Sequence, residues 1–235
     1  MKKIGIGLLN LLYPKRCCFC GKISRKALCE TCREKVIYVE EPRCKKCGKP
    51  IRFQEDEYCY DCRRQVFFYE QGKSVWLHKE PVSTSIYQFK YHNKRWFASY
   101  YAQELYRLYG DWMKRCHIDV IIPVPLHKKR RRKRGYNQAE VLAKELSERS
   151  HIPVNKKAVI RVGETTPQKT LGRGQRKRNL KDAFFVTKHW KREKNVLIVD
   201  DIYTTGSTID ALAEKLREKG AEKVWFLTIS IGQGF

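Results

Sequence analysis

The segment from Asn195 to Asp210, NVLIVDDIYTTGSTID, constrains the fold of this chain more than any other. It begins with an aliphatic run from Val196 to Val199, which is typical of a fully buried parallel strand. Two adjacent carboxylates follow this run, and ligands of open α/β sheets bind at the carboxyl ends of such strands. A loop of hydroxyl residues and one glycine then leads into a segment with helical periodicity. This order predicts an α/β domain with a ligand site at a strand end.

The residues after this strand have the chemistry of a site for a phosphorylated ribose. The acids, Asp200 and Asp201, are suited to accept hydrogen bonds from a vicinal diol or to hold a divalent cation beside it. Backbone N–H groups at a helix start bind phosphate, and a glycine lacks the Cβ that keeps an anion away. The alternative is an ordinary strand-to-helix turn with a fortuitous acid pair. The candidate residues are Asp200, Asp201, Thr204, Thr205, Gly206, Ser207 and Thr208.

This segment resembles the signature for 5-phosphoribosyl 1-pyrophosphate (PRPP) in type I phosphoribosyltransferases, over about thirteen residues. The resemblance implies a Rossmann-like α/β domain with a mainly parallel sheet, and PRPP bound with Mg²⁺ at the acid pair. We expect helices between the strands of this domain. The strands are predicted near Ser74, Asp119, Ala158, Val196 and Val224.

Cysteine dominates the amino-terminal part of the chain, where nine of the ten cysteines lie between Cys17 and Cys62. Eight of them form four Cys-x-x-Cys pairs, and two such pairs complete a tetrahedral Zn²⁺ site. The segment has few apolar residues, so we expect it to need its metal to fold. We predict a double zinc ribbon over residues 1–66, with one structural zinc ion on Cys17, Cys20, Cys29 and Cys32 and another on Cys44, Cys47, Cys59 and Cys62.

Other arrangements of these cysteines stay open at this point. The competing zinc pairing is cross-braced, with the first Cys-x-x-Cys pair joined to the third. Disulfide bonds are the alternative to metal, but no secretion signal supports them. Cys18 is predicted to be a bystander within the first pair, and Cys116 a core thiol.

The first thirteen residues combine Lys2 and Lys3 with a short apolar run, so a signal peptide has to be considered. Asn10 interrupts the run and no small-residue cleavage site follows, which favours a short helix packed on the body. No stretch of about eighteen apolar residues occurs, so stable membrane insertion is not expected. The sequence therefore predicts a cytoplasmic protein.

Positive charge is the main compositional feature, since 50 basic and 25 acidic residues give a formal net charge of +25. This excess indicates a polyanionic partner or phosphate-bearing ligands. After the predicted strand Asp119–Pro125, an unbroken basic run contains Lys128, Lys129, Arg130, Arg131, Arg132, Lys133 and Arg134. One or two cations suffice for a pyrophosphate, so the surplus favours a longer polyanion, for which we predict DNA. A solvated charge run is the alternative.

Aromatic residues are interleaved with basic ones after Pro81, a pattern that also occurs where unpaired bases stack on a protein. The near-helical spacing of Trp96, Tyr100 and Leu105 instead favours the buried face of a helix over roughly residues 94–109. We predict core packing for most of these aromatics and keep one or two as stacking platforms. Single-stranded DNA is therefore the favoured nucleic acid.

The order of motifs along the chain resembles the ComF (ComFC-like) family over nearly the whole length. The matching segments are the cysteine pairs, IIPVPLHKKRRRKRGYNQAEVLA, TPQKTLGRGQRKRNLKDAF and VLIVDDIYTTGST. Members are associated with bacterial competence and DNA uptake, and they combine a zinc ribbon with a type I phosphoribosyltransferase-like domain. The resemblance implies a pyrophosphate loop at Val124, Pro125, Leu126 and His127.

A second loop, over residues 165–182, is implied by the same resemblance to close on PRPP. Cations beside glycines are suited to neutralise a pyrophosphate as such a loop shuts. A disordered basic loop is the alternative, and both descriptions hold if the loop orders only with ligand. The cations are Lys169, Arg173, Arg176, Lys177 and Arg178.

These observations predict a competence or DNA-uptake accessory protein that binds PRPP and DNA, with residues 67–235 forming the phosphoribosyltransferase-like domain. Proteins of the competence machinery are the further partners implied. One alternative is an active phosphoribosyltransferase that uses Mg²⁺-PRPP, although Thr204 stands where hypoxanthine-type purine enzymes carry an acid, and no acceptor site or catalytic residue is identified. The other is a zinc-ribbon nucleic-acid adaptor with a vestigial PRPP site. Whether the chain is an enzyme is left open.

Overall fold

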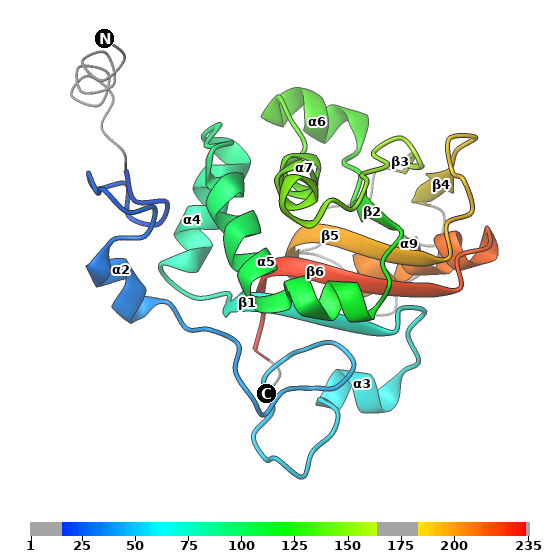
Figure 1. The fold of residues 1–235 in the computed structure, drawn as a ribbon, viewed down its shortest axis with the longest axis horizontal. Helices are drawn as coiled ribbons and strands as arrows, with labels where there is room; N and C mark the ends of the chain where they lie inside the picture. The colour runs from blue at the N-terminus through cyan, green and yellow to red at the C-terminus, as the bar shows by residue number, and fades with distance from the viewer. Residues whose placement is uncertain (1–15, 164–182, 234–235) are drawn as a thin grey trace.

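The computed structural model describes residues 16–163 and 183–233. Its centre is a four-stranded sheet in the order β1-β6-β5-β2 (Figure 1). All three strand pairings are parallel, which confirms the predicted α/β class. The strands are β1 Gln71–Leu77, β2 Val120–Pro123, β5 Asn195–Tyr203 and β6 Lys223–Ile231.

Alternation along the strands gives this sheet two buried faces. Leu197 and Val199 of β5 join one core cluster, together with inward residues of the helices α4, α5 and α7. Val196 and Ile198 join the other cluster, which includes the apolar stripe of α9. Ala139, Leu142, Ala143 and Leu146 of α7 are all buried, so this helix is amphipathic. The helices are α4 Val82–Tyr91, α5 Phe97–Arg115, α7 Gln138–Ser150 and α9 Ser207–Glu218.

The strand predicted near Ala158 does not belong to this sheet. It is β3 Val159–Arg161, which pairs antiparallel with β4 Phe184–Val186 in a separate two-stranded sheet. The outer edge of β2 is hydrogen-bonded to the segment that follows α7. Ile121 N donates to the carbonyl of Pro153 at 2.8 Å, and Ile121 O accepts from Asn155 N at 3.0 Å. The edge is therefore occupied before the chain reaches β3.

The aromatic segment after Pro81 forms two helices rather than the single helix predicted over residues 94–109. The helix α4 precedes α5, and Trp96 stands just before α5 with 47% of its surface exposed. Core packing is confirmed for several rings, whereas Trp96, Tyr87 and Tyr91 are exposed. The buried aromatics are Phe89, Phe97, Tyr101 and Tyr109.

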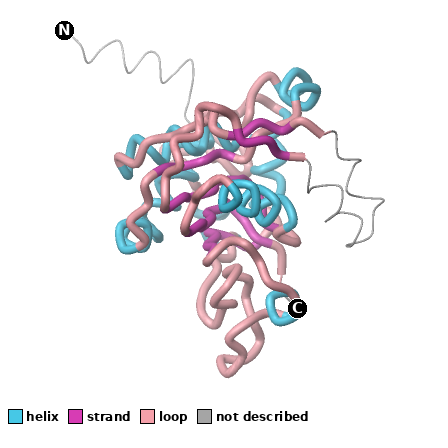
Figure 2. The backbone as a smooth tube through the Cα atoms, turned by 90° about the vertical axis from the view of Figure 1, so that its right-hand side faces the viewer, coloured by secondary structure: helices cyan, strands magenta, loops and turns pink. Residues whose placement is uncertain are grey.

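The two cysteine-rich modules join different core clusters. The first, with α2 Glu30–Lys35, contributes Phe19 to the cluster of α5, and the Phe19 ring meets Trp76 edge-on at 5.4 Å. The second, with α3 Tyr60–Arg64, contributes Cys44, Cys47 and Cys59 to the cluster of α9. Figure 2 shows that this second module, below the sheet, is largely loop.

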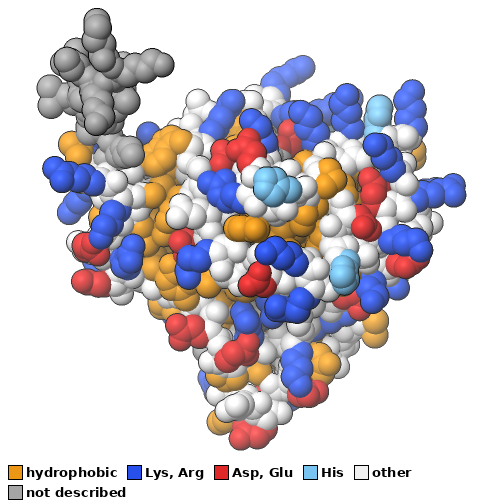
Figure 3. Space-filling view, in the orientation of Figure 1, with side chains coloured by type: hydrophobic (Ala, Val, Ile, Leu, Met, Phe, Trp, Pro, Cys, Tyr) orange, Lys and Arg blue, Asp and Glu red, His pale blue; other side chains and the backbone are white. Residues whose placement is uncertain are grey.

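The basic run Lys128–Arg134 is a helix, α6, on the upper side of the molecule in Figure 1. Lys and Arg side chains gather along the same upper edge in the space-filling view (Figure 3). None of the helices in the described ranges is long and apolar enough to cross a membrane. The short helix expected over the first thirteen residues lies outside these ranges.

Candidate functional site

The eight paired cysteines form two compact clusters. One comprises Cys17, Cys20, Cys29 and Cys32, the other Cys44, Cys47, Cys59 and Cys62, and the sulfur atoms of each cluster lie within 4.8 Å of one another. This sequential pairing is the predicted one, and it excludes the cross-braced alternative. The closest approaches between pairs, such as 3.6 Å for Cys47–Cys59, are far longer than a disulfide bond, and all ten cysteines are free.

Four thiolates at these separations fit a tetrahedral structural Zn²⁺ site, so the donor set supports two zinc ions. Glycine is required in the second cluster, because Gly48 has φ +77° and a Cβ would lie 2.7 Å from the carbonyl oxygen of Gly72. Cys18 lies outside both clusters, is buried, and its pKa is raised to about 12 by that burial. Cys116 is only partly buried at the edge of the core.

The acid pair lies within β5 rather than after it, because the strand continues to Tyr203. Asp201 is 7% exposed, and its backbone N–H donates to Asp200 Oδ1 at 2.8 Å. Burial, and then the negative charge of Asp201, raise the pKa of Asp200 to about 7 against the opposing charges of Lys90 and Arg161. Both carboxylates therefore lie at the carboxyl end of the strand, close enough for the charge of Asp201 to act on Asp200.

The hydroxyl-rich loop joins β5 to α9, as the sequence predicts. Gly206 caps the helix with φ +80°, and the Thr205 and Ser207 hydroxyls are 2.9 Å apart. Beneath the loop, the Tyr203 ring stacks on Phe226 and its hydroxyl lies 2.7 Å from that of Tyr69. The loop thus rests on a rigid aromatic floor, with its hydroxyl side chains partly or fully exposed.

The loop at Val124–His127 leaves β2 beside the acid pair. Val124 N donates to the carbonyl of Val199 at 3.0 Å, and the Asn137 side-chain amide donates to the carbonyl of Val124 at 3.0 Å. Asn137 also caps α7, because its Oδ1 accepts from Ala139 N. Pro125, Leu126 and His127 line one side of a cavity of about 340 Å³, which Lys128, Arg131 and Arg161 also line.

The helix α6 continues directly from this loop, and Arg131 and Arg134 anchor it to neighbouring helices. Arg131 makes a two-pronged ion pair with Glu140, at 2.8 and 3.1 Å. Arg134 donates to Tyr91 and Gln138, both at 3.0 Å. Within the described part of the chain, no ion pair involves Lys128, Arg130, Arg132 or Lys133, and all four are exposed.

Two cations near the acids were not predicted from the sequence. Lys90, in the last turn of α4, lies 2.8 Å from Asp201 Oδ1, and Arg161 of β3 acts electrostatically on Asp200. Each is separated from the acids by dozens of residues in sequence, and no local pattern marks either of them. The predicted loop cations Lys169, Arg173, Arg176, Lys177 and Arg178 lie outside the described residues.

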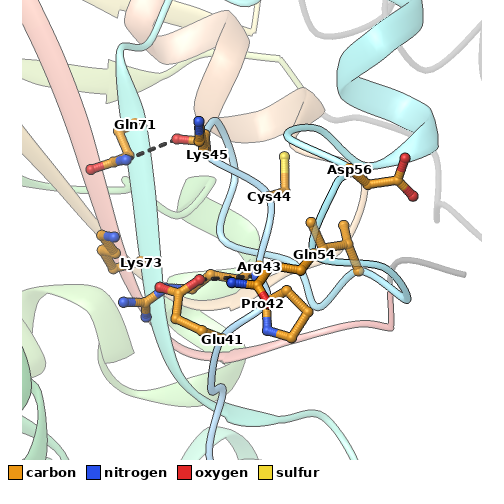
Figure 4. Close-up of a pocket in the computed structure, with 10 residues that line it drawn as sticks. Glu41, Pro42, Arg43, Cys44, Lys45, Gln54, Asp56, Gln71 and Lys73 are labelled. Carbon is orange, nitrogen blue, oxygen red and sulfur yellow. Dashed lines mark hydrogen bonds and ion pairs between the residues drawn. The ribbon is translucent and has the colours of Figure 1, made fainter.

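A separate cleft of about 520 Å³ lies between the second cysteine module and β1 (Figure 4). Arg43 pairs with Glu41 at 2.7 Å, and Gln71 donates to the carbonyl of Lys45 at 2.8 Å. Burial lowers the pKa of Lys73, which also lines the cleft. This cleft contains neither the acid pair nor the hydroxyl-rich loop.

Comparison with known proteins agrees with this architecture. Residues 8–63 match the family model of the double zinc ribbon domain, and residues 98–230, more than half of the chain, match that of the phosphoribosyl transferase domain. Competence protein F of Haemophilus influenzae is 40% identical over 151 residues, 62% of this chain and 66% of the relative.

Two other curated relatives have related names. Competence protein ComFC of Bacillus subtilis is 32% identical over 155 residues, 64% of this chain and 59% of the relative. DNA utilization protein YhgH of Escherichia coli K12 is 40% identical over 111 residues, 46% and 48% of the two chains. The matches thus span about half to two thirds of these relatives. The predicted ComF resemblance is confirmed, and the chain belongs to the phosphoribosyl transferase domain family, joined here to a double zinc ribbon.

Proposed function

We propose that this protein is a cytoplasmic accessory of competence or DNA uptake that binds Mg²⁺-PRPP at the acid pair and single-stranded DNA along α6. Residues 1–66 serve as the zinc ribbon and residues 67–235 as the phosphoribosyltransferase-like domain. The observation that carries the proposal is convergence: the acid pair, the hydroxyl-rich loop and the Val124–His127 loop lie at the carboxyl ends of the adjacent parallel strands β5 and β2. This end of a parallel sheet is where α/β domains bind ligands.

The residues at the acid pair fit the two groups that the proposal requires. Carboxylate oxygens are the ligands that Mg²⁺ prefers, so Asp200 and Asp201 would hold the cation beside the ribose diol. Mg²⁺ supplies positive charge that offsets the phosphates of the bound ligand. The 5′-phosphate would bind the backbone N–H groups at the start of α9 and the hydroxyls of Thr204, Thr205, Ser207 and Thr208.

The pyrophosphate of PRPP and the phosphates of DNA are assigned to the loop after β2 and to α6. The pyrophosphate would bind at Val124–His127, with Lys169, Arg173, Arg176, Lys177 and Arg178 as additional cations. DNA would bind along α6, whose unpaired cations project into solvent and extend beyond the cavity at its start. The printed names of the relatives, competence and DNA utilization proteins, support a role in handling DNA. Proteins of the competence machinery are proposed as further partners.

The double variant Asp200→Asn with Asp201→Asn tests the PRPP site. We expect Mg²⁺-PRPP affinity, measured by calorimetry on zinc-loaded protein, to fall by at least about tenfold, because charged hydrogen bonds and a metal ligand are lost. Asp111→Asn, at an exposed position of α5, is the matched control and leaves affinity unchanged. Equal affinity of the double variant and the wild type would refute the ribose assignment. Repeating the titration with single-stranded DNA present shows whether the two ligands compete.

A further inference from the structure

The ion pair between Lys90 and Asp201 is the least expected feature of the acid pair's surroundings. The Lys90 Nζ lies 2.8 Å from Asp201 Oδ1, and the two side chains are only 18% and 11% exposed. An ion pair with this little solvent contact is screened far less than one on the surface. Lys90 is therefore a strong local counter-ion for Asp201.

The position of Lys90 also connects the acid pair to the loop after β2. The buried side-chain amide of Gln138 donates to the carbonyl oxygen of Lys90 at 3.3 Å. The preceding residue, Asn137, holds the carbonyl of Val124. The last turn of α4 is thus fixed to the start of α7, which in turn fixes the loop Val124–His127. Lys90 therefore contacts the acid pair through its ammonium and the start of α7 through its carbonyl.

Binding of a divalent cation at the acid pair conflicts with this ion pair. A cation held by Asp201 would lie close to the Lys90 ammonium, and two positive charges at such a distance repel each other strongly in a partly buried site. The lysine side chain is a flexible stem of four carbons, so rotation about its bonds can move the ammonium by several ångströms (roughly) while the helix stays in place. The backbone of Lys90 is tied through α7 to the loop Val124–His127, so the pyrophosphate assigned to that loop is the anion that the ammonium would meet.

We propose that Lys90 is an exchangeable counter-ion, which neutralises Asp201 in the absence of ligand and moves to the pyrophosphate when Mg²⁺-PRPP binds. This inference rests on the proposed function. It makes Lys90 a positioning residue that opposes binding of the metal alone and favours the metal together with PRPP. The protein would then avoid filling its site with free cation before the phosphorylated ligand arrives.

Two ligands tested on one variant distinguish this role from a structural one. In Lys90→Met, Mn²⁺ alone, followed by electron paramagnetic resonance as a probe of the Mg²⁺ site, should bind about fivefold more tightly, because a competing charge has gone. Mg²⁺-PRPP, followed by calorimetry, should bind about tenfold more weakly, because a charge-assisted contact with pyrophosphate is lost. Lys79→Met, which removes an exposed lysine just before α4, is the matched control and changes neither affinity.

Further measurements decide the inference if Lys90→Met is poorly folded. Lys90→Arg keeps the charge and should restore most of the PRPP affinity. In the wild type, labelling of the Lys90 amine by a lysine reagent, read by mass spectrometry, should rise with Mn²⁺ alone and fall again with Mn²⁺ and PRPP.

Each contrary outcome has a distinct meaning. Parallel losses of both affinities in Lys90→Met, or no change in either, overturn the counter-ion role. Wild-type protein that binds Mn²⁺ but no PRPP overturns the proposed function and the movement to pyrophosphate. In that case the Mn²⁺ comparison still decides whether Lys90 competes with metal.

Discussion

Gly206 shows how a single missing side chain shapes the proposed ligand end of β5. Its φ of +80° is in the left-handed region, and a Cβ at this position would overlap the hydroxyl of Tyr203. Tyr203 has little freedom to move, because its ring stacks on Phe226 at 4.7 Å and its hydroxyl bonds to Tyr69. Both the backbone angle and the aromatic floor therefore require glycine.

Replacing this glycine should cost more than the backbone angle alone explains. We expect Gly206→Ala to lose about 1 kcal/mol of unfolding free energy from the left-handed φ and a further ~1–3 kcal/mol from the overlap with Tyr203. Gly135→Ala is the matched control, because Gly135 has φ +77° and its nearest neighbour would be 3.9 Å away. Urea denaturation measures both variants. Equal losses would show that the aromatic floor yields, and the floor would then not be rigid.

At the scale of elements, α6 is a helix composed only of cations. Repulsion between its like charges offsets the favourable helix propensity of Lys and Arg. Gly135 ends the helix in the left-handed conformation, and its N–H donates to the carbonyl of Arg131 at 2.8 Å. Arg131 and Arg134 attach the helix to α7 and α4. Lys128, Arg130, Arg132 and Lys133 remain available for a phosphate backbone.

The salt dependence of DNA binding should follow from those other side chains. If Lys128, Arg130, Arg132 and Lys133 each neutralise one phosphate of single-stranded DNA, log affinity should fall against log salt with a slope of about −3. Changing all four to Ala should bring the slope near zero and weaken binding equally for every sequence, since backbone contacts carry no base readout. Fluorescence anisotropy over a salt series measures the slope.

A control with the same loss of charge is available at the opposite end of the sheet. Lys188, Lys191, Arg192 and Lys223 are exposed and lie before or at the first residues of β5 and β6. Their replacement by Ala should leave the slope unchanged. If the two quadruple variants lose affinity equally, net charge rather than α6 determines DNA binding.

At the scale of the whole molecule, the two cysteine clusters support different parts of the body. The first packs through Phe19 against Trp76 of β1 and Tyr101 of α5. The second lies against the aromatic floor, where the Lys49 ammonium is 5.9 Å from the Tyr203 ring centre and the Lys46 ammonium 5.5 Å from that of Tyr69. Loss of the metal from the first cluster and loss of the metal from the second should therefore affect the proposed PRPP site differently.

We expect about two zinc ions per chain by elemental analysis, and about one after either pair of cysteines is changed to serine. Cys44→Ser with Cys47→Ser should lower both the melting temperature and the PRPP affinity, because the floor beneath Gly206 loses its support. Cys17→Ser with Cys20→Ser is the matched variant and should lower the melting temperature while affecting PRPP much less. Equal effects on PRPP affinity would contradict the assignment of the floor to the second cluster.

Much of the architecture depends on short-range chemistry and could be predicted from the sequence alone. The run of strand, acids, hydroxyl loop and helix is contiguous, as is each Cys-x-x-Cys pair, so propensity, turn chemistry and ligand spacing determine them within a few residues. The apolar residues Ala139, Leu142, Ala143 and Leu146 of α7 follow helical spacing in the sequence for the same reason. In contrast, α4 was missed, although Val82, Ile86 and Phe89 have helical spacing, because the surrounding exposed aromatics obscured it.

Other features were decided only by the tertiary structure, since they depend on which distant groups share a buried volume. The occupied edge of β2 removed β3 from the main sheet, and packing assigned the two cysteine modules to different core clusters. Lys90 meets Asp201 because α4 and β5 pack together, across more than a hundred residues of sequence. Local sequence determines the chemical groups that each segment carries. Tertiary structure determines which charges pair, because a buried carboxylate needs a partner of opposite charge and the fold can bring that partner from a distant segment.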